Sequence, residues 1–448
     1  MISVLIFLLS QVATLGIAVS AHPYVAFLGY QIIYFMYHDS RWWYLMVPGF
    51  SYSFVCSATL VLLALTKRGK QPNQLLKAPA FLWMYALLAF YALTYFWASN
   101  TDLHVFSLDD YVKTIVVMSA AYVLCTSEKA LNAYLWGYVA TAAYIGYYAL
   151  EIGRTSGGRF DLIGTVDAPE VNGIAAATAP ASVLALHMFW TAKHHMQRAA
   201  SVVLGALLVN GLVLMNSRGA FLGVAVGAGA YVFFLLRTPF PEPGVRAKAI
   251  GIGFAGLLSL IAVLDKSAIE RFQSIFDSTA PTEEQETGAT RLYFWRAAYD
   301  MSFDYPLGKG YRGFFFEGLE YMPRGIAGGG RARSVHSTWF EVLTEVGYPG
   351  LFFFCMMLWA SWKQLKAVKK TAVSLGTPEH YYIGCVLQAS LLSFMVCMSF
   401  LDRMRAEVLY WLVLFAACAY AVIVVRSQSG EQMRRPSAGA SPLAFAQD

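Results

Sequence analysis

The stretch "SVVLGALLVNGLVLMNSRGAFLGVAVGAGAYVFFLL", residues 201–236, carries one charged residue, Arg218, among 36. As one continuous helix it would be about 54 Å long at 1.5 Å per residue, whereas the apolar core of a bilayer is about 30 Å thick. The run must therefore fold back on itself, and Asn-Ser-Arg-Gly at 216–219 supplies turn-forming residues near its middle. This pattern predicts two membrane-spanning helices joined by a tight turn, with Arg218 at the membrane surface.

The rest of the chain has the same apolar character. Of its 448 residues 58% are hydrophobic and 13% are charged, against about 25% charged residues in soluble domains. We expect an all-α polytopic membrane protein with 12 or 13 crossings, in which residues 1–425 form a single transmembrane domain and 426–448 a disordered cytoplasmic tail. The first 65 residues allow two or three of these crossings. The candidate spans are 2–20, 22–37, 44–65, 79–97, 112–125, 131–150, 172–190, 200–216, 219–236, 249–264, 349–362, 380–400 and 406–425.

Cysteine usage and charge exclude several classes of function. All six cysteines fall inside apolar runs without a C-x-x-C pair, which predicts packing residues and neither a disulfide framework nor a zinc site. The net charge of +6 is accounted for by loops that flank the membrane, so no nucleic-acid partner is indicated. The N-terminus has no basic region before its apolar run, which predicts a first membrane helix and not a cleaved signal peptide.

The basic loops predict the orientation in the membrane, because lysine- and arginine-rich loops are retained in the cytoplasm. When the spans alternate, the connections near 66–77, 191–198, 237–248 and 362–370 fall on one side together with the tail. The Asn-Ser-Arg-Gly turn and a long segment, residues 265–337, fall on the other, which is then the periplasm or cell exterior. This segment is longer than an ordinary connection, and Thr290 can cap a helix in which Leu292, Trp295, Tyr299 and Phe303 repeat at helical spacing.

A histidine stands where this segment meets the membrane, in "HSTWFEVLTEVGYPG", residues 336–350. Thr338 and Glu341 have the spacing of a capping box, which predicts that a helix begins after His336. Gly347 is placed to end that helix and Pro349 to begin the next, so we expect a short interfacial helix over 338–346. A neutral imidazole at this helix start could act as a base, although composition alone favours a surface histidine.

Two arginines are predicted on the same side of the membrane. Arg218 is costly at the membrane surface unless it meets an anion or snorkels to water. Arg291, in the first turn of the loop helix, opposes the helix dipole, so it either faces solvent freely or is kept for an anion. Arginine binds phosphate oxygens in a bidentate manner and stays protonated. Together with His336, these residues are typical of a site for a lipid diphosphate and a hydroxyl nucleophile. No Asp-x-Asp metal motif accompanies them.

The chain resembles the O-antigen ligase family within the wider superfamily of O-antigen polymerases and O-glycosylation ligases. The resemblance rests on His336, Ser337, nine further residues and Gly-Tyr-Pro-Gly (347–350), similar to the family signature His-[Asn/Ser/Gln]-x9-Gly-x-x-Gly. Support comes from "NSRGAFLG" around Arg218, "TRLYFWRAA" around Arg291 and "PLGKGY" ahead of the histidine. Arg159 and Asn172 resemble a looser feature of the second periplasmic loop, from which this sequence departs because two residues separate its proline from its asparagine.

This resemblance implies a GT-C-like, all-helical glycosyltransferase at the periplasmic face of the bacterial inner membrane that works without a metal or other cofactor. The implied donor is an undecaprenyl diphosphate-linked glycan, and the acceptor is a hydroxyl of the lipid A core oligosaccharide. Arg218 and Arg291 would hold the diphosphate, His336 would activate the hydroxyl, and Ser337, Arg159 and Asn172 would contribute to substrate binding. A polymerase or an O-glycosylation ligase with the same donor is the alternative. A lipid-linked oligosaccharide flippase is disfavoured, because charges within the spans are scarce.

Overall fold

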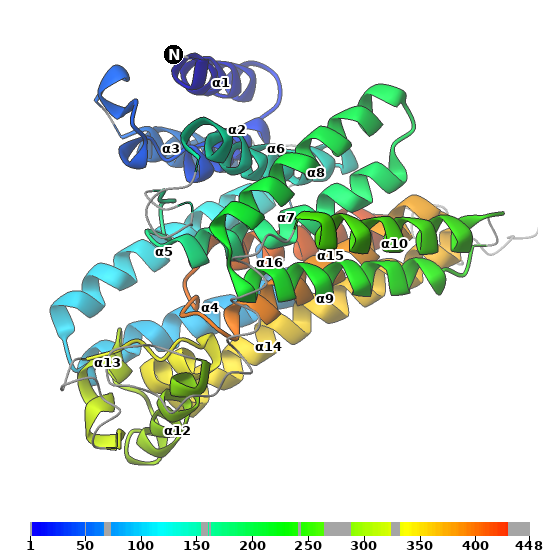
Figure 1. The fold of residues 1–448 in the computed structure, drawn as a ribbon. Coiled ribbons are helices and arrows are strands. Elements are labelled where there is room, and N and C mark those ends of the chain that lie inside the picture. Colours follow the sequence, from blue (N-terminus) through cyan, green and yellow to red (C-terminus); the bar gives the residue numbers. More distant parts are fainter. Residues whose placement is uncertain are drawn as a thin grey trace, which may run out of the picture.

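The computed structural model describes residues 2–49, 51–66, 73–153, 160, 163–240, 243–263, 288–323 and 332–428. In these residues every regular element is helical (Figure 1), and eight helices are long and apolar enough to cross a membrane. The expectation of an all-α, multi-pass membrane protein is therefore confirmed. The count of 12 or 13 crossings stays a prediction, and most of the tail, residues 429–448, lies outside the described residues.

The described chain forms helices joined by mostly short connections. A π-helical turn, Tyr420–Val425, extends the last helix. The helices are α1 (Ile2–Ser20), α2 (Val25–Phe35), α3 (Tyr52–Thr66), α4 (Pro79–Leu93), α5 (Thr101–Leu124), α6 (Glu128–Ile152), α7 (Val171–Thr191), α8 (His195–Met215), α9 (Arg218–Leu236), α10 (Val245–Val263), α12 (Gly288–Asp304), α13 (Gly313–Glu317), α14 (Thr338–Leu375), α15 (Pro378–Met398) and α16 (Glu407–Ala419).

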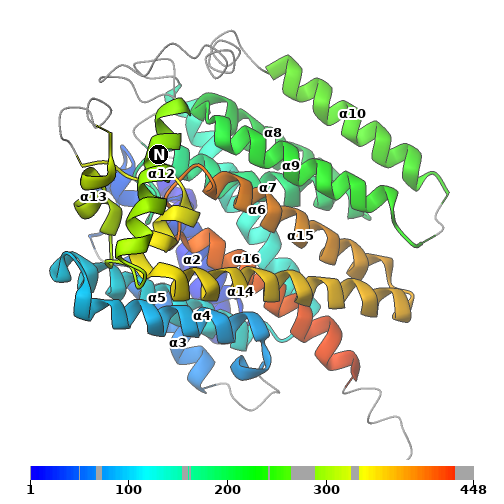
Figure 2. The same cartoon turned by 90° about the horizontal axis from the view of Figure 1, so that it is seen from below.

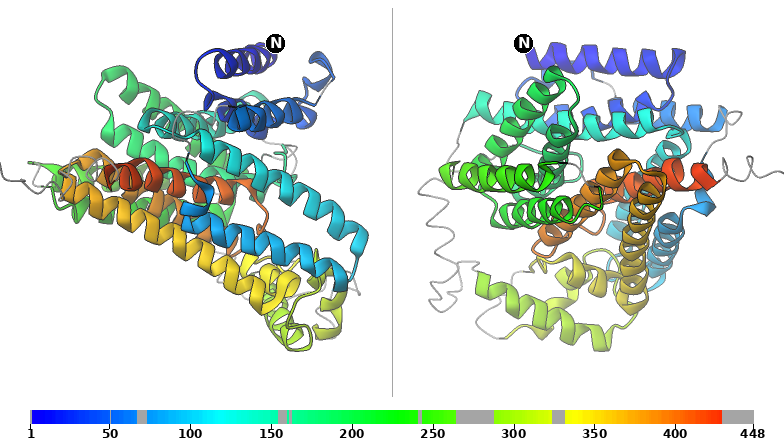
Figure 3. Two further views of the ribbon diagram at one scale, coloured as in Figure 1. Left: turned by 180° about the vertical axis from the view of Figure 1, so that it is seen from behind. Right: turned by 90° about the vertical axis from the view of Figure 1, so that its right-hand side faces the viewer.

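The second and third apolar segments are shorter than the sequence suggested. At 11 residues, α2 is about 16 Å long and falls short of a bilayer core, and α3 begins only at Tyr52. The buried guanidinium of Arg41 donates to the carbonyl of Phe35 at 2.6 Å and so occupies the end of α2. Residues between the two helices form 3₁₀ turns, so the expected spans 22–37 and 44–65 are wrong in their bounds. The N-terminal helix α1 packs against α2 at the rim of the bundle (Figure 3).

The predicted turn between α8 and α9 is confirmed. Asn216 adopts the left-handed conformation that ends α8, and α9 begins at Arg218. Along α9, glycines allow close packing on α15, since a Cβ at Gly223 would lie 2.8 Å from the carbonyl oxygen of Ser393. Arg218 is therefore the first residue of a helix that packs tightly against α15.

The predicted break after the short helix is also confirmed. Gly347 has φ 62° and ψ −164° inside α14, which separates residues 338–346 from the long crossing that follows. A Cβ on Gly347 would lie 2.1 Å from the carbonyl oxygen of Pro306, and the N–H of Tyr348 donates to that oxygen at 3.0 Å. Only glycine fits this position, because both the backbone angle and the space exclude a side chain.

The loop helix α12 differs from its prediction in two respects. It begins at Gly288, two residues before the expected cap Thr290, which is buried. The predicted apolar stripe is largely its exposed face, since Leu292, Tyr299 and Phe303 are 61%, 43% and 60% exposed. The helix instead packs through Phe294, Ala297, Ala298 and Met301, because the small alanines allow a close approach.

The helix ends that bear the candidate residues gather at one end of the bundle, on the left in Figure 2. The N–H of Ser99, between α4 and α5, donates to the carbonyl of Lys309 at 2.9 Å, and the N–H of Phe160 donates to the carbonyl of Leu214 at 2.8 Å. The connection between α4 and α5 thus meets the segment that follows α12, and Phe160 meets the last turn of α8. We call this the site end of the bundle.

Candidate functional site

The connection between α15 and α16, residues 399–406, lies beside all three principal candidate residues. The guanidinium of Arg291 donates to the carbonyl of Phe400 at 3.3 Å. A Cβ on Gly219, the neighbour of Arg218, would lie 3.7 Å from the Phe400 side chain. The N–H of Ser337, the neighbour of His336, donates to the carboxylate of Asp402 at 3.0 Å. Residues far apart in sequence therefore converge on one short segment.

His336 lies ahead of α14 as predicted, in an unusual backbone conformation. Its φ of 54° is uncommon for a residue with a side chain. The half-buried ring lies 6.2 Å from the ring of Phe294 on α12, one turn beyond Arg291. Burial raises the pKa of the Asp402 carboxyl above its ordinary value, and the charge of His336 opposes this shift. An imidazole and a carboxyl group thus interact electrostatically at the start of the helix.

The predicted capping box is wrong, and the difference explains how the 399–406 connection is held. Ser337 is the N-cap residue, without a side-chain cap. The hydroxyl of Thr338 instead donates to the carbonyl of Leu401 at 2.7 Å and accepts from the N–H of Arg403 at 2.9 Å. The carboxylate of Glu341 accepts from the N–H of Met404 at 2.9 Å. Both side chains form hydrogen bonds with the backbone of the 399–406 connection, because its buried N–H and C=O groups need partners.

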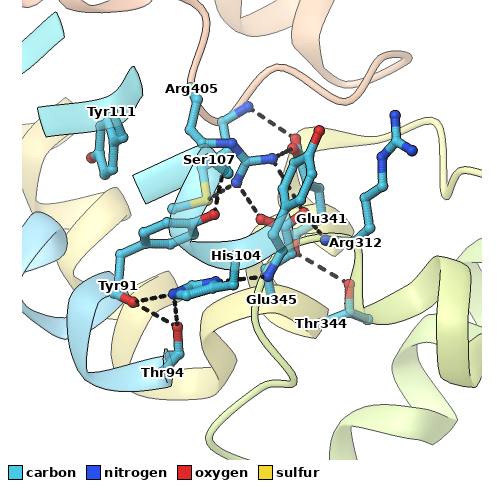
Figure 4. A network of polar contacts seen from close by, with 12 residues as sticks. Tyr91, Thr94, His104, Ser107, Tyr111, Arg312, Glu341, Thr344, Glu345 and Arg405 are labelled. Atoms are coloured by element: carbon cyan, nitrogen blue, oxygen red, sulfur yellow. Dashed lines mark hydrogen bonds and ion pairs between the residues drawn. The ribbon is translucent and has the colours of Figure 1, made fainter. Parts of the chain in front are cut away.

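Arg405 fixes the same connection through two carboxylates of the short helix (Figure 4). Its guanidinium donates to Glu341 at 3.0 Å and to Glu345 at 3.2 Å, with a second, closer contact to Glu345. Glu341 and Glu345 are only 6% and 3% exposed. The i, i+4 spacing places both acids on one face of the helix, so one arginine can bridge them. We call these three residues the Arg405 clamp.

The clamp extends to α4, α5 and the segment before α13. Arg405 lies over the rings of Tyr91 and Tyr311, at 5.4 and 4.7 Å from their centroids. Glu345 also accepts from the N–H of Arg312 at 2.8 Å, and His104 accepts from the N–H of Tyr311 at 3.0 Å (Figure 4). Polar groups from five segments therefore hold the clamp in one arrangement.

Arg403 joins the other side of the connection to the start of α7. It donates to the carbonyl of Asp167 at 2.9 Å and pairs with Glu170 at 3.3 Å. Its guanidinium packs so closely on Gly173 that a Cβ there would overlap it, at 1.4 Å. Asn172, the second residue of α7, is thus the chain neighbour of the glycine on which Arg403 packs. Arg159 lies outside the described residues.

Sequence reasoning missed Asp402, Arg403 and Arg405, although the pattern contains a signal for them. Asp402, Arg403, Arg405 and Glu407 place four charged residues within six positions between two apolar spans. Charges at such a point are costly unless they are paired or functional.

The cysteines occupy mostly packing positions, in agreement with their prediction. Cys56, Cys125, Cys385, Cys397 and Cys418 are buried, and Cys355 is exposed on α14. Cys397 contacts the carbonyl of Gly219 at 3.6 Å, so it contributes to the packing of α15 against the start of α9.

The arrangement offers the groups that a transfer from a diphosphate requires. Two guanidinium groups, which remain charged, can bind phosphate oxygens. A half-buried imidazole beside a carboxyl group can accept a proton from a hydroxyl. The site end therefore combines two guanidinium groups, as candidates for anion binding, with a candidate base.

Comparison with known proteins gives one family match. Residues 181–355 match the family model described as O-antigen ligase. This segment includes Arg218, Arg291, His336, Ser337 and the Gly347 break, while the 399–406 connection follows it in the chain. A search of curated proteins found no match. Residues 181–355 of the chain are therefore similar to the O-antigen ligase family.

Proposed function

We propose that this protein is a glycosyltransferase that moves a glycan en bloc from undecaprenyl diphosphate to a hydroxyl of the lipid A core oligosaccharide. The reaction would occur at the periplasmic face of the inner membrane. The observation that carries the proposal is the convergence of Arg218, Arg291 and His336 on residues 399–406. The match of residues 181–355 to the O-antigen ligase family model supports a lipid-linked glycan as the donor.

In the proposed reaction the acceptor oxygen attacks the anomeric carbon of the first sugar. The bond between this carbon and the diphosphate oxygen breaks in the same displacement, so the anomeric configuration inverts. His336 takes the proton of the acceptor hydroxyl, and Arg218 and Arg291 stabilise the charge on the departing diphosphate. No metal or other cofactor is part of the proposal.

Two further residues have supporting roles. Asp402 would stabilise the charge that His336 acquires, as a carboxylate does beside a catalytic imidazole. Ser337 is 2% exposed and its N–H binds Asp402, so we assign it to positioning this carboxylate and not to direct substrate contact. Asn172, the second residue of α7, and Arg159, which lies outside the described residues, stay candidates for substrate binding.

A lipopolysaccharide gel after gene deletion and complementation in the native host tests the proposal. The deletion should leave core-only lipopolysaccharide while long glycans accumulate on undecaprenyl diphosphate. Complementation with the His336→Ala variant should leave this defect, with the protein still present in the membrane. A deletion strain whose core carries single repeat units would contradict the ligase assignment and indicate a polymerase. Unchanged lipopolysaccharide with loss of protein glycosylation would indicate an O-glycosylation ligase.

A further inference from the structure

Helix α12 has an exposed face of unusual composition. Leu292, Arg296, Tyr299 and Phe303 follow one another at intervals of three or four residues and so share one side of the helix. Leu292 and Phe303 are 61% and 60% exposed. We call these four residues the α12 outer face. Large exposed apolar side chains on one stripe indicate a binding surface.

The C-terminal end of α12 lies where two membrane-spanning helices leave the apolar region. The hydroxyl of Ser302 is 2.8 Å from the hydroxyl of Tyr348, at the start of the long crossing in α14. Just after α12, the carbonyl of Leu307 accepts from the indole N–H of Trp97, at the end of the span Pro79–Trp97. The helix is therefore attached to the outer ends of both spans.

The surface of these two spans continues into the α12 outer face. Phe96 and Phe352 are 77% and 52% exposed on helices that cross the membrane, so their side chains face lipid. Tyr95, Trp97 and Tyr348 lie at the same ends, and tyrosine and tryptophan are enriched at the boundary between lipid and water. The contact of Ser302 with Tyr348, and that of Leu307 just after α12 with Trp97, place the C-terminal end of the helix at this level.

The direction and charge of α12 also suit this boundary. The helix runs across the end of α14 and not along it (Figure 2). Arg296 pairs with Asp300 at 2.9 Å and lies over the ring of Tyr299, at 5.7 Å from its centroid. Interfacial helices combine such a basic residue with Leu, Phe and aromatic side chains on the apolar side.

We propose that α12 is an interfacial helix whose outer face lies in the lipid leaflet at the site end of the bundle. Its partner is the boundary between the phospholipid headgroups and the acyl chains. The opposite side of the helix faces the protein, where Arg291 donates to Phe400. The helix thus separates lipid from the candidate site, and a lipid-linked substrate moving in this leaflet meets α12 on its way to Arg291.

Spin-label accessibility in lipid nanodiscs tests the proposal. A Cys355→Ser background removes the exposed cysteine among those described, and the other five are buried. Leu292→Cys and Phe303→Cys report on the outer face, Phe352→Cys is the lipid-facing control, and Glu320→Cys on an exposed turn is the water-facing control. Each variant carries one nitroxide, and its collisions with oxygen and with a water-soluble nickel chelate are compared.

Labels at 292 and 303 should favour oxygen over the chelate by about the same ratio as the label at 352. A chelate accessibility equal to that at 320 would overturn the proposal and place the face in water. Spin–spin broadening at 292 and 303 that disappears on dilution with unlabelled protein would also overturn it, because a second copy of the chain would then cover the face. The readout needs no transferase activity, so its failure and the failure of the proposed reaction are distinguishable.

Discussion

Gly347 is the residue whose replacement has the clearest structural consequence. It has a positive φ, and a Cβ at this position would meet the carbonyl of Pro306 at 2.1 Å. Gly347→Ala should destabilise the protein by on the order of 3 kcal/mol, because backbone strain and a steric clash add. Gly376→Ala is the matched control, since Gly376 has φ +67° but no atom within 4 Å of its Cβ position.

The Gly376→Ala control should lower the free energy of unfolding by only about 1–2 kcal/mol, because it adds the strain of the left-handed conformation without a clash. Thermal unfolding of both purified variants in the same detergent measures the difference. Equal unfolding midpoints for the two variants would show that the contact with Pro306 does not matter.

Arg291 is expected to act on the reaction through its guanidinium. Arg291→Ala should reduce transfer by about 10²-fold or more, the range found when one group that stabilises developing charge is removed. Arg198 is exposed near the start of α8, at the opposite end of the bundle from the site, and Arg198→Ala should keep normal activity. An in vitro transfer assay with purified protein and lipid-linked donor compares them. Normal activity of Arg291→Ala would remove this residue from the diphosphate site.

At neutral pH, the buried carboxyl group of Asp402 should lower the folding stability of the protein but support its transferase activity. Burial raises the pKa of its carboxyl, so the folded state holds the proton more tightly than the unfolded chain. The resulting stability is fully present below the ordinary pKa of about 4 and is lost as the pH rises through the raised value. Asp402→Asn should therefore unfold at a higher temperature than the wild type at pH 7.5, and the gap should close as the pH falls toward about 4.

The same variant should lose transferase activity at neutral pH, because an amide cannot stabilise a charged His336. Unfolding midpoints across this pH range, together with the transfer assay, separate the two effects. A stability difference that does not change with pH would contradict the assignment of the raised pKa to this carboxyl.

At the scale of elements, the Arg405 clamp joins the α15–α16 connection to the short helix of α14. Arg405→Met should destabilise the protein by about 3–5 kcal/mol, because two buried carboxylates lose their partner. The exposed pair Lys193–Glu379 is the control, and Lys193→Ala should cost less than about 1 kcal/mol. Thermal unfolding measures both. A combined Arg405→Met, Glu341→Gln, Glu345→Gln variant should recover part of the loss, and its failure to do so would favour a packing role for Arg405.

At the scale of the whole molecule, the orientation in the membrane can be tested from opposite ends of one helix. Ser334 is exposed just before α14, and Ser374 is exposed near its C-terminal end. In intact cells Ser334→Cys should react with a membrane-impermeant maleimide, and Ser374→Cys should react only after the inner membrane is permeabilised. The Cys355→Ser background keeps the reaction specific. The reverse pattern would place the site end in the cytoplasm.

Local chemistry was sufficient to predict several features of this fold. The apolar run 201–236 required a reversal, and Asn216 makes it in the left-handed conformation. The break at Gly347 followed from glycine before proline. These features depend on residues close in sequence, so the periodicity and backbone preferences of the chain determine them. Which side of α12 packs against the protein could not be predicted in this way, because an apolar stripe packs equally well on protein or on lipid.

The sequence by itself determined that this chain is a helical membrane protein and that Arg218, Arg291 and His336 lie in recognisable motifs. Only the tertiary structure decided what brings these residues together. Thr338 and Glu341 have the spacing of a local cap, yet their side chains bind Leu401, Met404 and Arg405, some 60 residues further along the chain. A spacing rule describes neighbours within one helix, whereas buried polar groups take the nearest partner in space, whichever segment supplies it.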